Sequence, residues 1–135
     1  MAERLSPEQY SATLIDHFER PRNAGAMADA DAEAFVTNPV CGDSLRIFLR
    51  FADGRVTASS FLSSGCPASI ATSSAATEMV TGRTLEEAEA FTRDDYAAAV
   101  DGLPASKVHC SVLAASAVRQ AVAAWRAKHP APGPA

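Results

Sequence analysis

The feature that most constrains the fold is a long apolar stripe near the C-terminus. Between residues 111 and 128 apolar side chains recur every three or four positions, with most charged and polar side chains elsewhere; they are Val112, Leu113, Val118, Ala121, Val122 and Trp125. This spacing predicts an amphipathic helix with one buried face. The segment Lys107-Val108-His109-Cys110 stands at its start. We therefore expect a firmly packed helix that fixes the imidazole of His109 and the thiol of Cys110 at its N-terminus.

The position of Cys110 predicts a reactive thiol. The N-terminus of a helix presents unpaired backbone N–H groups and the positive end of the helix dipole, and both favour thiolate. The thiolate is the form of cysteine that attacks electrophiles and binds metals. Lys107 lies three residues earlier and adds positive charge. We expect Cys110 to be a nucleophile or a metal ligand.

Length and charge limit the classes of protein that the chain can belong to. Its 135 residues with 47% hydrophobic content predict one globular domain over residues 1–128, followed by a disordered Pro/Ala-rich tail over 129–135. A formal net charge of -4 argues against nucleic acid as the main partner. No apolar stretch reaches membrane-spanning length, and no signal peptide is recognisable. Three cysteines cannot form a closed disulfide framework, so we expect a reduced, cytoplasmic protein.

The pattern along the chain alternates between helical and strand periods. Strands are predicted over residues 33–37, 44–51 and 56–62, and the Asp53-Gly54 pair predicts a hairpin turn between the last two. Capping boxes that begin at Ser6 and Thr84, a helix start at Thr92 and apolar spacing predict the helices. Their ranges are 6–19, 67–81, 84–91, 92–100 and 111–128.

All three cysteines fall where one predicted element gives way to the next. Cys41 lies in a Pro- and Gly-containing turn with Asp43 two positions later, and Cys66 lies between Gly65 and Pro67, before a helix. A lone cysteine is commonly a small buried apolar residue, and no pair has the Cys-x-x-Cys spacing of a zinc knuckle. Together, however, the three positions and the neighbouring His109 favour a metal site. His17 is better interpreted as a residue with a solvated or helix-capping role than as a ligand, and His129 as a tail residue.

These motifs, taken jointly, carry a family resemblance over residues 8–128. The chain resembles the iron–sulfur cluster assembly scaffolds of the IscU and NifU N-terminal type. The similar segments occur in the same order in both. They are Ile15-Asp16-His17-Phe18, Pro21-Arg22-Asn23, Cys41-Gly42-Asp43, Gly65-Cys66, Ser69 to Ser74, Thr77 to Gly82, and Leu103-Pro104 through His109-Cys110.

The resemblance implies an α+β fold in which a small three-stranded antiparallel sheet packs against about five helices. It implies that one exposed edge gathers the metal ligands Cys41, Asp43, Cys66, His109 and Cys110. There such scaffolds, which are not enzymes, bind iron and build a transient [2Fe-2S] cluster. Thiolates suit cluster iron, whereas a carboxylate is a poorer match, so Asp43 is expected to keep the cluster labile. The implied partners are a cysteine desulfurase, an electron donor such as ferredoxin, and apo iron–sulfur proteins.

The chain departs from that family pattern before the His-Cys pair. The IscU branch usually has Leu-Pro-Pro-Val-Lys there as a chaperone-recognition segment, but Ala105 and Ser106 replace its second proline and its valine. The resemblance therefore does not imply that a chaperone assists release of the cluster from this protein. The zinc-dependent SufU branch normally lacks a histidine beside the last cysteine, so His109 favours the scaffold interpretation.

Two alternatives remain open. In the first, Asp43, Cys66, His109 and Cys110 hold zinc, which is also possible in the cluster-free scaffold, and the protein relays sulfur from a desulfurase. In the second, a closed structural zinc site holds the fold together, and metal removal unfolds the domain. A Cys-His hydrolase is less favoured, because His109 and Cys110 are sequence neighbours with no orienting third group.

Overall fold

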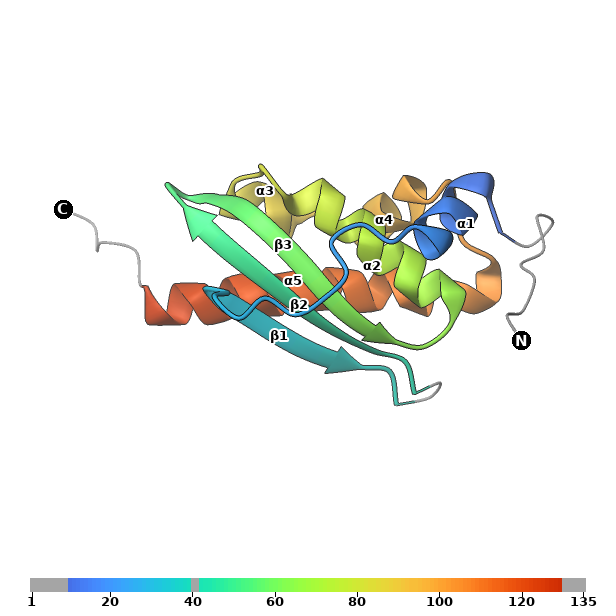
Figure 1. The fold of residues 1–135 in the computed structure, drawn as a ribbon, viewed down its shortest axis with the longest axis horizontal. Coiled ribbons are helices and arrows are strands. Elements are labelled where there is room, and N and C mark those ends of the chain that lie inside the picture. The colour runs from blue at the N-terminus through green and yellow to red at the C-terminus, as the bar shows by residue number, and fades with distance from the viewer. Residues whose placement is uncertain (1–9, 40–41, 130–135) are drawn as a thin grey trace.

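A three-stranded antiparallel sheet forms one layer of the computed structural model, which describes residues 10–39 and 42–129 (Figure 1). The strands lie in the order β1 (Ala32–Thr37), β2 (Ser44–Ala52), β3 (Arg55–Ser64). Both pairings are antiparallel, with a register shift in β2 at Arg50/Phe51. The sheet and helices confirm the predicted α+β class.

The predicted Asp-Gly turn joins β2 to β3. Asp53 has φ 54° and Gly54 has φ 74°. Two successive positive φ values are the signature of a two-residue turn whose twist matches that of the flanking strands. Glycine adopts this conformation without steric strain and aspartate tolerates it better than most residues. The hairpin is therefore specified locally by these two residues.

Helix α5 (His109–Lys128) is the long amphipathic helix expected from the apolar stripe, and it packs against β1 and β2. It begins two residues earlier than the spacing predicted, so His109 and Cys110 belong to its first turn. A 3-10 turn, η1 (Ala105–Lys107), leads into it. The buried apolar residues shared by α5 and the sheet form the core. They include Val36, Leu45, Ile47, Leu49, Val56, Leu113, Val118, Ala121 and Val122.

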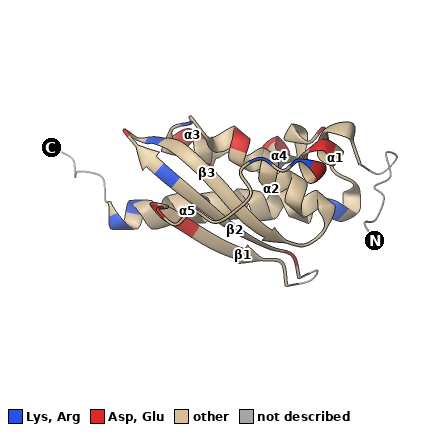
Figure 2. Ribbon diagram, in the orientation of Figure 1, with Lys and Arg blue, Asp and Glu red and all other residues tan. Residues whose placement is uncertain are grey.

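Helix α2 (Pro67–Val80) lies beside β3, α5 and α1 and is buried along most of its length. Only one of its residues, Glu78, is charged, and Figure 2 shows most of its ribbon in the colour of uncharged residues. Its hydroxyl side chains are bonded internally: Thr72 donates to the Ala68 carbonyl at 2.7 Å and Ser73 to the Ser69 carbonyl at 2.8 Å. Such bonds let a polar helix lie in the interior.

Helix α1 (Ala12–Glu19) packs against α2. The structure places its start at Ala12, because Ser11 caps it by accepting a hydrogen bond from the Leu14 N–H at 2.9 Å. The predicted cap at Ser6 lies outside the described residues. His17 was expected to have a solvated or helix-capping role, but only 7% of it is exposed. Its ring contacts Ser74 of α2, so the interpretation of this residue as solvated was wrong.

Two short helices complete the layer: α3 (Leu85–Ala90) and α4 (Arg93–Ala99). The capping box predicted at Thr84 is present, and the helix start predicted at Thr92 also forms a capping box. None of the helices within the described residues has the length and apolar character needed to cross a membrane.

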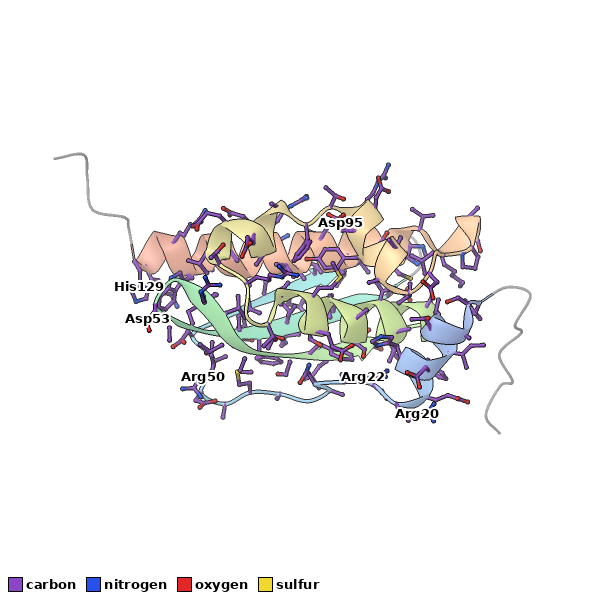
Figure 3. The ribbon with its side chains drawn as sticks, turned by 90° about the horizontal axis from the view of Figure 1, so that it is seen from above. Arg20, Arg22, Arg50, Asp53, Asp95 and His129 are labelled. Carbon is purple, nitrogen blue, oxygen red and sulfur yellow. The ribbon has the colours of Figure 1, made fainter. Side chains whose placement is uncertain are left out.

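The predicted tail begins at His129, and all of it beyond that residue lies outside the described residues. His129 itself stacks on Trp125, with ring centroids 3.6 Å apart. Figure 3 shows His129 at the end of the molecule opposite Arg20 of the segment that follows α1.

Candidate metal and sulfur site

Three element boundaries meet at one end of the molecule (Figure 1). The turn between β1 and β2 contributes Asp43, the start of α2 contributes Cys66, and the start of α5 contributes His109 and Cys110. In the turn, the Asn38 carbonyl accepts from the Gly42 N–H at 2.7 Å and the Asn38 N–H donates to the Asp43 carbonyl at 2.8 Å. The fold therefore brings four of the five predicted ligands together from separate segments.

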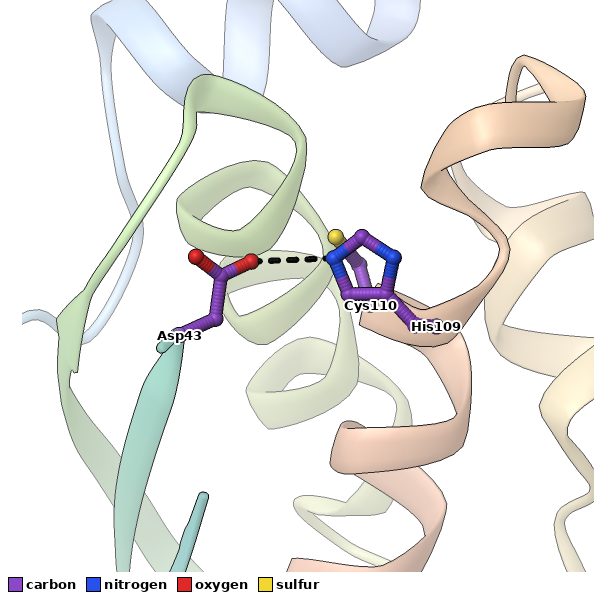
Figure 4. Close-up of side chains that lie close together, drawn as sticks. All are labelled: Asp43, His109 and Cys110. Carbon is purple, nitrogen blue, oxygen red and sulfur yellow. Dashed lines mark hydrogen bonds and ion pairs between the residues drawn. The ribbon is translucent and has the colours of Figure 1, made fainter. Parts of the chain in front are cut away.

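Asp43 and His109 are in direct contact (Figure 4). Nε2 of His109 lies 3.0 Å from Oδ2 of Asp43. Asp43 is 6% exposed, so this carboxylate is held in the protein rather than in solvent. One ligand atom each from Asp43, His109 and Cys110 lies within 4.8 Å of the others. An oxygen, a nitrogen and a sulfur are thus close enough to share one metal ion.

Cys66 adds a second sulfur to this group. Its Sγ lies 3.7 Å from Oδ2 of Asp43 and 3.8 Å from Sγ of Cys110. Cys110 is only 2% exposed, whereas Cys66 is partly exposed. Cys66 is the N-cap residue of α2, as Pro67 predicted, and its side chain makes no capping hydrogen bond. Its sulfur is therefore available to the site.

The two thiols differ in acidity. The hydrogen-bonding contact with Cys110 Sγ lowers the pKa of Cys66 to about 6, although burial opposes this shift. The same hydrogen bond, together with burial, raises the pKa of Cys110 above that of an ordinary thiol. Without metal, the thiolate of the pair is therefore on Cys66. The sequence argument had assigned that advantage to Cys110.

Lys107 supports the negative charge of the site. It ends the 3-10 turn before α5, and its ammonium group acts to lower the pKa of both Cys66 and Cys110. Its role as a supporting charge in sulfur transfer stays a prediction. Cys41 lies outside the described residues. Its role as a ligand, and that of Cys110 as the sulfur acceptor, stay predictions.

The sequence analysis assigned no role to Gly65. A Cβ atom built on this residue would lie 2.6 Å from Oδ1 of Asp43, well inside van der Waals contact. The glycine therefore lets the chain before α2 approach the carboxylate closely. A Gly directly before a ligand Cys was the available signal, because close backbone approach is a common reason for glycine.

A groove of about 460 Å³ lies beside His109, between β1 and α5. Phe35 of β1 and Val112 of α5 line it, and they are 51% and 42% exposed. Sequence reasoning missed this groove. Val112 belongs to the periodic apolar stripe of the helix, and spacing alone does not distinguish an exposed apolar residue from a buried one.

The donor set suits a transition metal. Thiolate and imidazole ligands bind iron and zinc, and a carboxylate oxygen completes a mixed set for either metal. Four such donors from the described residues are gathered at one end, which also leaves Cys66 partly accessible. The arrangement can therefore hold a metal and present a sulfur atom to a partner.

Comparison with known proteins shows similarity to iron–sulfur cluster assembly scaffolds over nearly the whole chain. Residues 9–131 match the family described as "NifU-like N terminal domain". The iron–sulfur cluster assembly scaffold protein IscU 1 of Archaeoglobus fulgidus is 51% identical over 84% of this chain and 74% of its own length. IscU of Escherichia coli K12 is 38% identical over 90% of this chain and 98% of its own.

Solved structures share the fold. The N-terminal NifU-like protein of Brucella abortus superposes with a TM-score of 0.76, covering 90% of this chain and 97% of its own, at 20% identity. A putative SUF-system scaffold from Fervidobacterium islandicum gives 0.70 at 20% identity, covering 87% and 99%. The resemblance inferred from the cysteine motifs is confirmed: this chain belongs to the NifU-like N-terminal domain family, together with the IscU iron–sulfur cluster assembly scaffolds.

Proposed function

We propose that this protein is a scaffold on which a labile [2Fe-2S] cluster is assembled and from which it is transferred to apo-proteins. The observation that carries the proposal is the meeting of Asp43, Cys66, His109 and Cys110 at one end of the fold. The high identity to named scaffold proteins over most of the chain supports it.

Sulfur enters the site as a persulfide from a cysteine desulfurase, with Cys110 as the acceptor and Lys107 as the supporting charge. Iron then binds to thiolates, which are its preferred cluster ligands, and the cluster is held by Cys41, Cys66 and Cys110 with Asp43 and His109 beside it. The cluster and its iron are cargo. An electron donor such as a ferredoxin supplies electrons, and apo iron–sulfur proteins receive the product.

Lability follows from the mixed donor set. A carboxylate is a harder ligand than thiolate and suits cluster iron less well. The contact of Asp43 with both His109 and Cys66 keeps this hard donor among the soft ones. A cluster in such a site leaves more readily than one held by four cysteines, and release is what a scaffold requires.

Anaerobic reconstitution tests the proposal. The metal-free protein is incubated with ferrous iron, cysteine, a desulfurase and a reductant, and cluster formation is followed by visible absorption with iron and sulfide analysis. We expect absorption bands of a [2Fe-2S] cluster and transfer of that cluster to an apo-ferredoxin. Stable zinc binding with no cluster bands under any of these conditions would contradict the proposal.

Ligand variants test the site itself. We expect Cys41→Ala, Cys66→Ala and Cys110→Ala each to weaken cluster assembly greatly while circular dichroism stays close to that of the parent, because the ligands lie at element ends. Val112→Ala on the exposed face of α5 is the matched control. Full cluster yield in any two cysteine variants would mean that the site is misplaced.

Sulfur entry is tested separately. Mass spectrometry after a short incubation with desulfurase and cysteine should find the added sulfur on Cys110 first. The lowered pKa and greater exposure of Cys66 make it the rival acceptor. First labelling of Cys66 or Cys41 would reverse the assignment while leaving the scaffold proposal intact.

A zinc-bound sulfur acceptor is the second candidate. The grouping of Asp43, His109 and Cys110 within 4.8 Å, with Cys66 beside them, also offers the four donors that zinc takes. In that case zinc would copurify, stay bound during turnover, and support persulfide transfer to a downstream acceptor. Metal analysis before and after reconstitution separates the two functions.

A further inference from the structure

The sulfur atoms of Cys66 and Cys110 are close enough to react with each other. They are 3.8 Å apart, at the N-termini of two different helices. A disulfide bond is about 2 Å long, so side-chain rotation has to close less than 2 Å.

We propose that Cys66 is a catalytic residue that, with Cys110, supplies the two electrons needed to reduce an incoming sulfane sulfur to sulfide. This inference rests on the proposed function, in which Cys110 carries the persulfide. A cluster contains sulfide, whereas a desulfurase delivers sulfur at the oxidation level of a persulfide. Two electrons per sulfur atom must therefore come from somewhere, and the neighbouring thiol is the nearest source.

The reaction is a thiol–persulfide exchange. Cys66 Sγ attacks Sγ of the Cys110 persulfide, a Cys66–Cys110 disulfide bond forms, and the bond from Cys110 Sγ to the sulfane sulfur breaks. The sulfane sulfur leaves with its own hydrogen as hydrosulfide, which takes up one proton to become hydrogen sulfide. The two cysteine sulfurs are oxidised by two electrons in total and the sulfane sulfur is reduced by two. No other oxidant is required.

The surroundings of the pair suit this exchange. Oδ2 of Asp43 lies 3.7 Å from Cys66 Sγ and 3.0 Å from Nε2 of His109, so groups able to exchange protons lie beside the reacting sulfur atoms. Cys110 is 2% exposed, which hinders attack by thiols from solution. A neighbouring thiol that is already in place avoids the entropy loss of a bimolecular encounter. Exchange rates depend strongly on such access.

The disulfide must be reduced before the next turnover. Two electrons and two protons return it to the dithiol, and a dithiol reductant or two one-electron donors can supply those electrons. Until then, Cys66 and Cys110 are not available to bind iron as thiolates. Sulfide is therefore expected to appear before the external reductant donates its electrons, not after.

The test uses the full, metal-free chain without reductant. The protein is loaded anaerobically with sodium polysulfide, desalted, and then assayed over time for free sulfide and, by non-reducing peptide mapping, for disulfides. In the parent we expect close to one sulfide for each persulfide, with a Cys66–Cys110 disulfide appearing at the same rate. In Cys66→Ser we expect the Cys110 persulfide to persist and sulfide release to slow by about tenfold or more.

Controls separate chemistry from folding. Val112→Ala should release sulfide at the parental rate, and circular dichroism should show that Cys66→Ser is folded. Three results would overturn the inference: transfer of the sulfane sulfur to Cys66 without sulfide release, an unchanged rate in folded Cys66→Ser, or a disulfide that instead joins Cys41. Repeating the loading with a desulfurase and cysteine tests the proposed function. If loading by the desulfurase fails while loading by polysulfide succeeds, the result contradicts the proposed sulfur acceptance and leaves the reaction of the thiol pair intact.

Discussion

Oδ2 of Asp43 lies 3.0 Å from Nε2 of His109, although 66 positions of sequence separate the two residues. The same oxygen lies 3.7 Å from Sγ of Cys66. A buried carboxylate that contacts two other candidate ligands is placed to influence both of them. The alternative role for Asp43 is local, in which its side-chain oxygen caps the turn after Gly42. That role accounts for neither contact. The Asp43 side chain therefore offers the sharpest test of the site.

Asp43→Ala should accumulate more cluster than the parent and transfer it more slowly. Removing the carboxylate leaves the iron with softer ligands and a drier surrounding, and both effects slow release. Cluster decay in air and transfer to an apo-ferredoxin, measured side by side, check this. Asp94→Ala, at an exposed position of α4, is the matched loss of one carboxylate. Unchanged rates in both assays would remove Asp43 from the site.

Gly65→Ala should alter the site without disturbing the core. The new methyl group would lie 2.6 Å from Oδ1 of Asp43, so the carboxylate must rotate away from its contact with His109. We expect metal affinity to fall by about 10-fold or more, as when a ligand's supporting contacts are lost. Zinc titration with a chromophoric chelator measures it. Gly54→Ala strains the hairpin at φ +74° but meets no atom within 4 Å, so it should lower stability and leave affinity unchanged.

The acidity of Cys66 predicts how its alkylation varies with pH in the metal-free protein. Because its pKa is lowered to about 6, the thiolate is present at neutral pH and is lost as the pH falls through 6. The rate of iodoacetamide labelling at Cys66, followed by peptide mass spectrometry, should have its midpoint there. Cys110→Ala removes the thiol whose contact lowers the pKa of Cys66 and should move the midpoint up toward about 8.5. An unchanged midpoint would mean that another contact lowers the pKa.

Local signals were sufficient to predict much of the fold. The Asp53-Gly54 turn and the boxes at Thr84 and Thr92 each involve residues at most three positions apart, so their physics is visible in a short window of sequence. The start of α5 was less visible. No side chain caps it, and the preceding 3-10 turn leads directly into the helix, so apolar spacing alone placed its start two residues late.

Contacts between distant segments were predictable only through the family resemblance. Cysteine positions at element ends indicated a site, but no periodicity specifies that Asp43 meets His109 or that Cys66 and not Cys110 is the more acidic thiol. That order depends on one hydrogen bond between residues on different helices. The burial of His17 was missed for a related reason. Its partner Ser74 is on α2, and the sequence of α1 alone does not show which face α2 covers.

Tyr96→Phe should leave the protein as stable as the parent or more stable. Tyr96 is 0% exposed, and its hydroxyl oxygen has no hydrogen-bond partner among the described residues. A buried hydroxyl without a partner destabilises the folded state by about 1–3 kcal/mol, whereas the ring keeps its packing in the variant. Urea denaturation should show a gain of up to about 3 kcal/mol. A loss larger than about 1 kcal/mol would mean that the hydroxyl is bonded.

The buried contact between His17 and α2 predicts that the fold loses stability as the pH falls. The ring Nδ1 lies 2.8 Å from Oγ of Ser74, which also accepts the Arg22 N–H, so the hydroxyl proton is free to point at a neutral imidazole. Burial lowers the pKa of His17, Arg22 lowers it further, and Glu78 and Asp16 oppose the shift. The folded state therefore favours the uncharged ring.

The sign of the pH effect follows from this lowered pKa. Below the unfolded pKa of about 6.5, the unfolded chain binds a proton that the folded chain binds less readily, so stability is lost as the pH falls. One such proton gives a slope of at most about 1.4 kcal/mol per pH unit. His17→Gln keeps a neutral hydrogen-bonding side chain and should remove this part of the slope between pH 7.5 and 5, as measured by urea denaturation. Glu78→Gln removes a group that opposes the shift and should steepen the slope. Parallel slopes in the parent and His17→Gln would show that His17 titrates alike in both states.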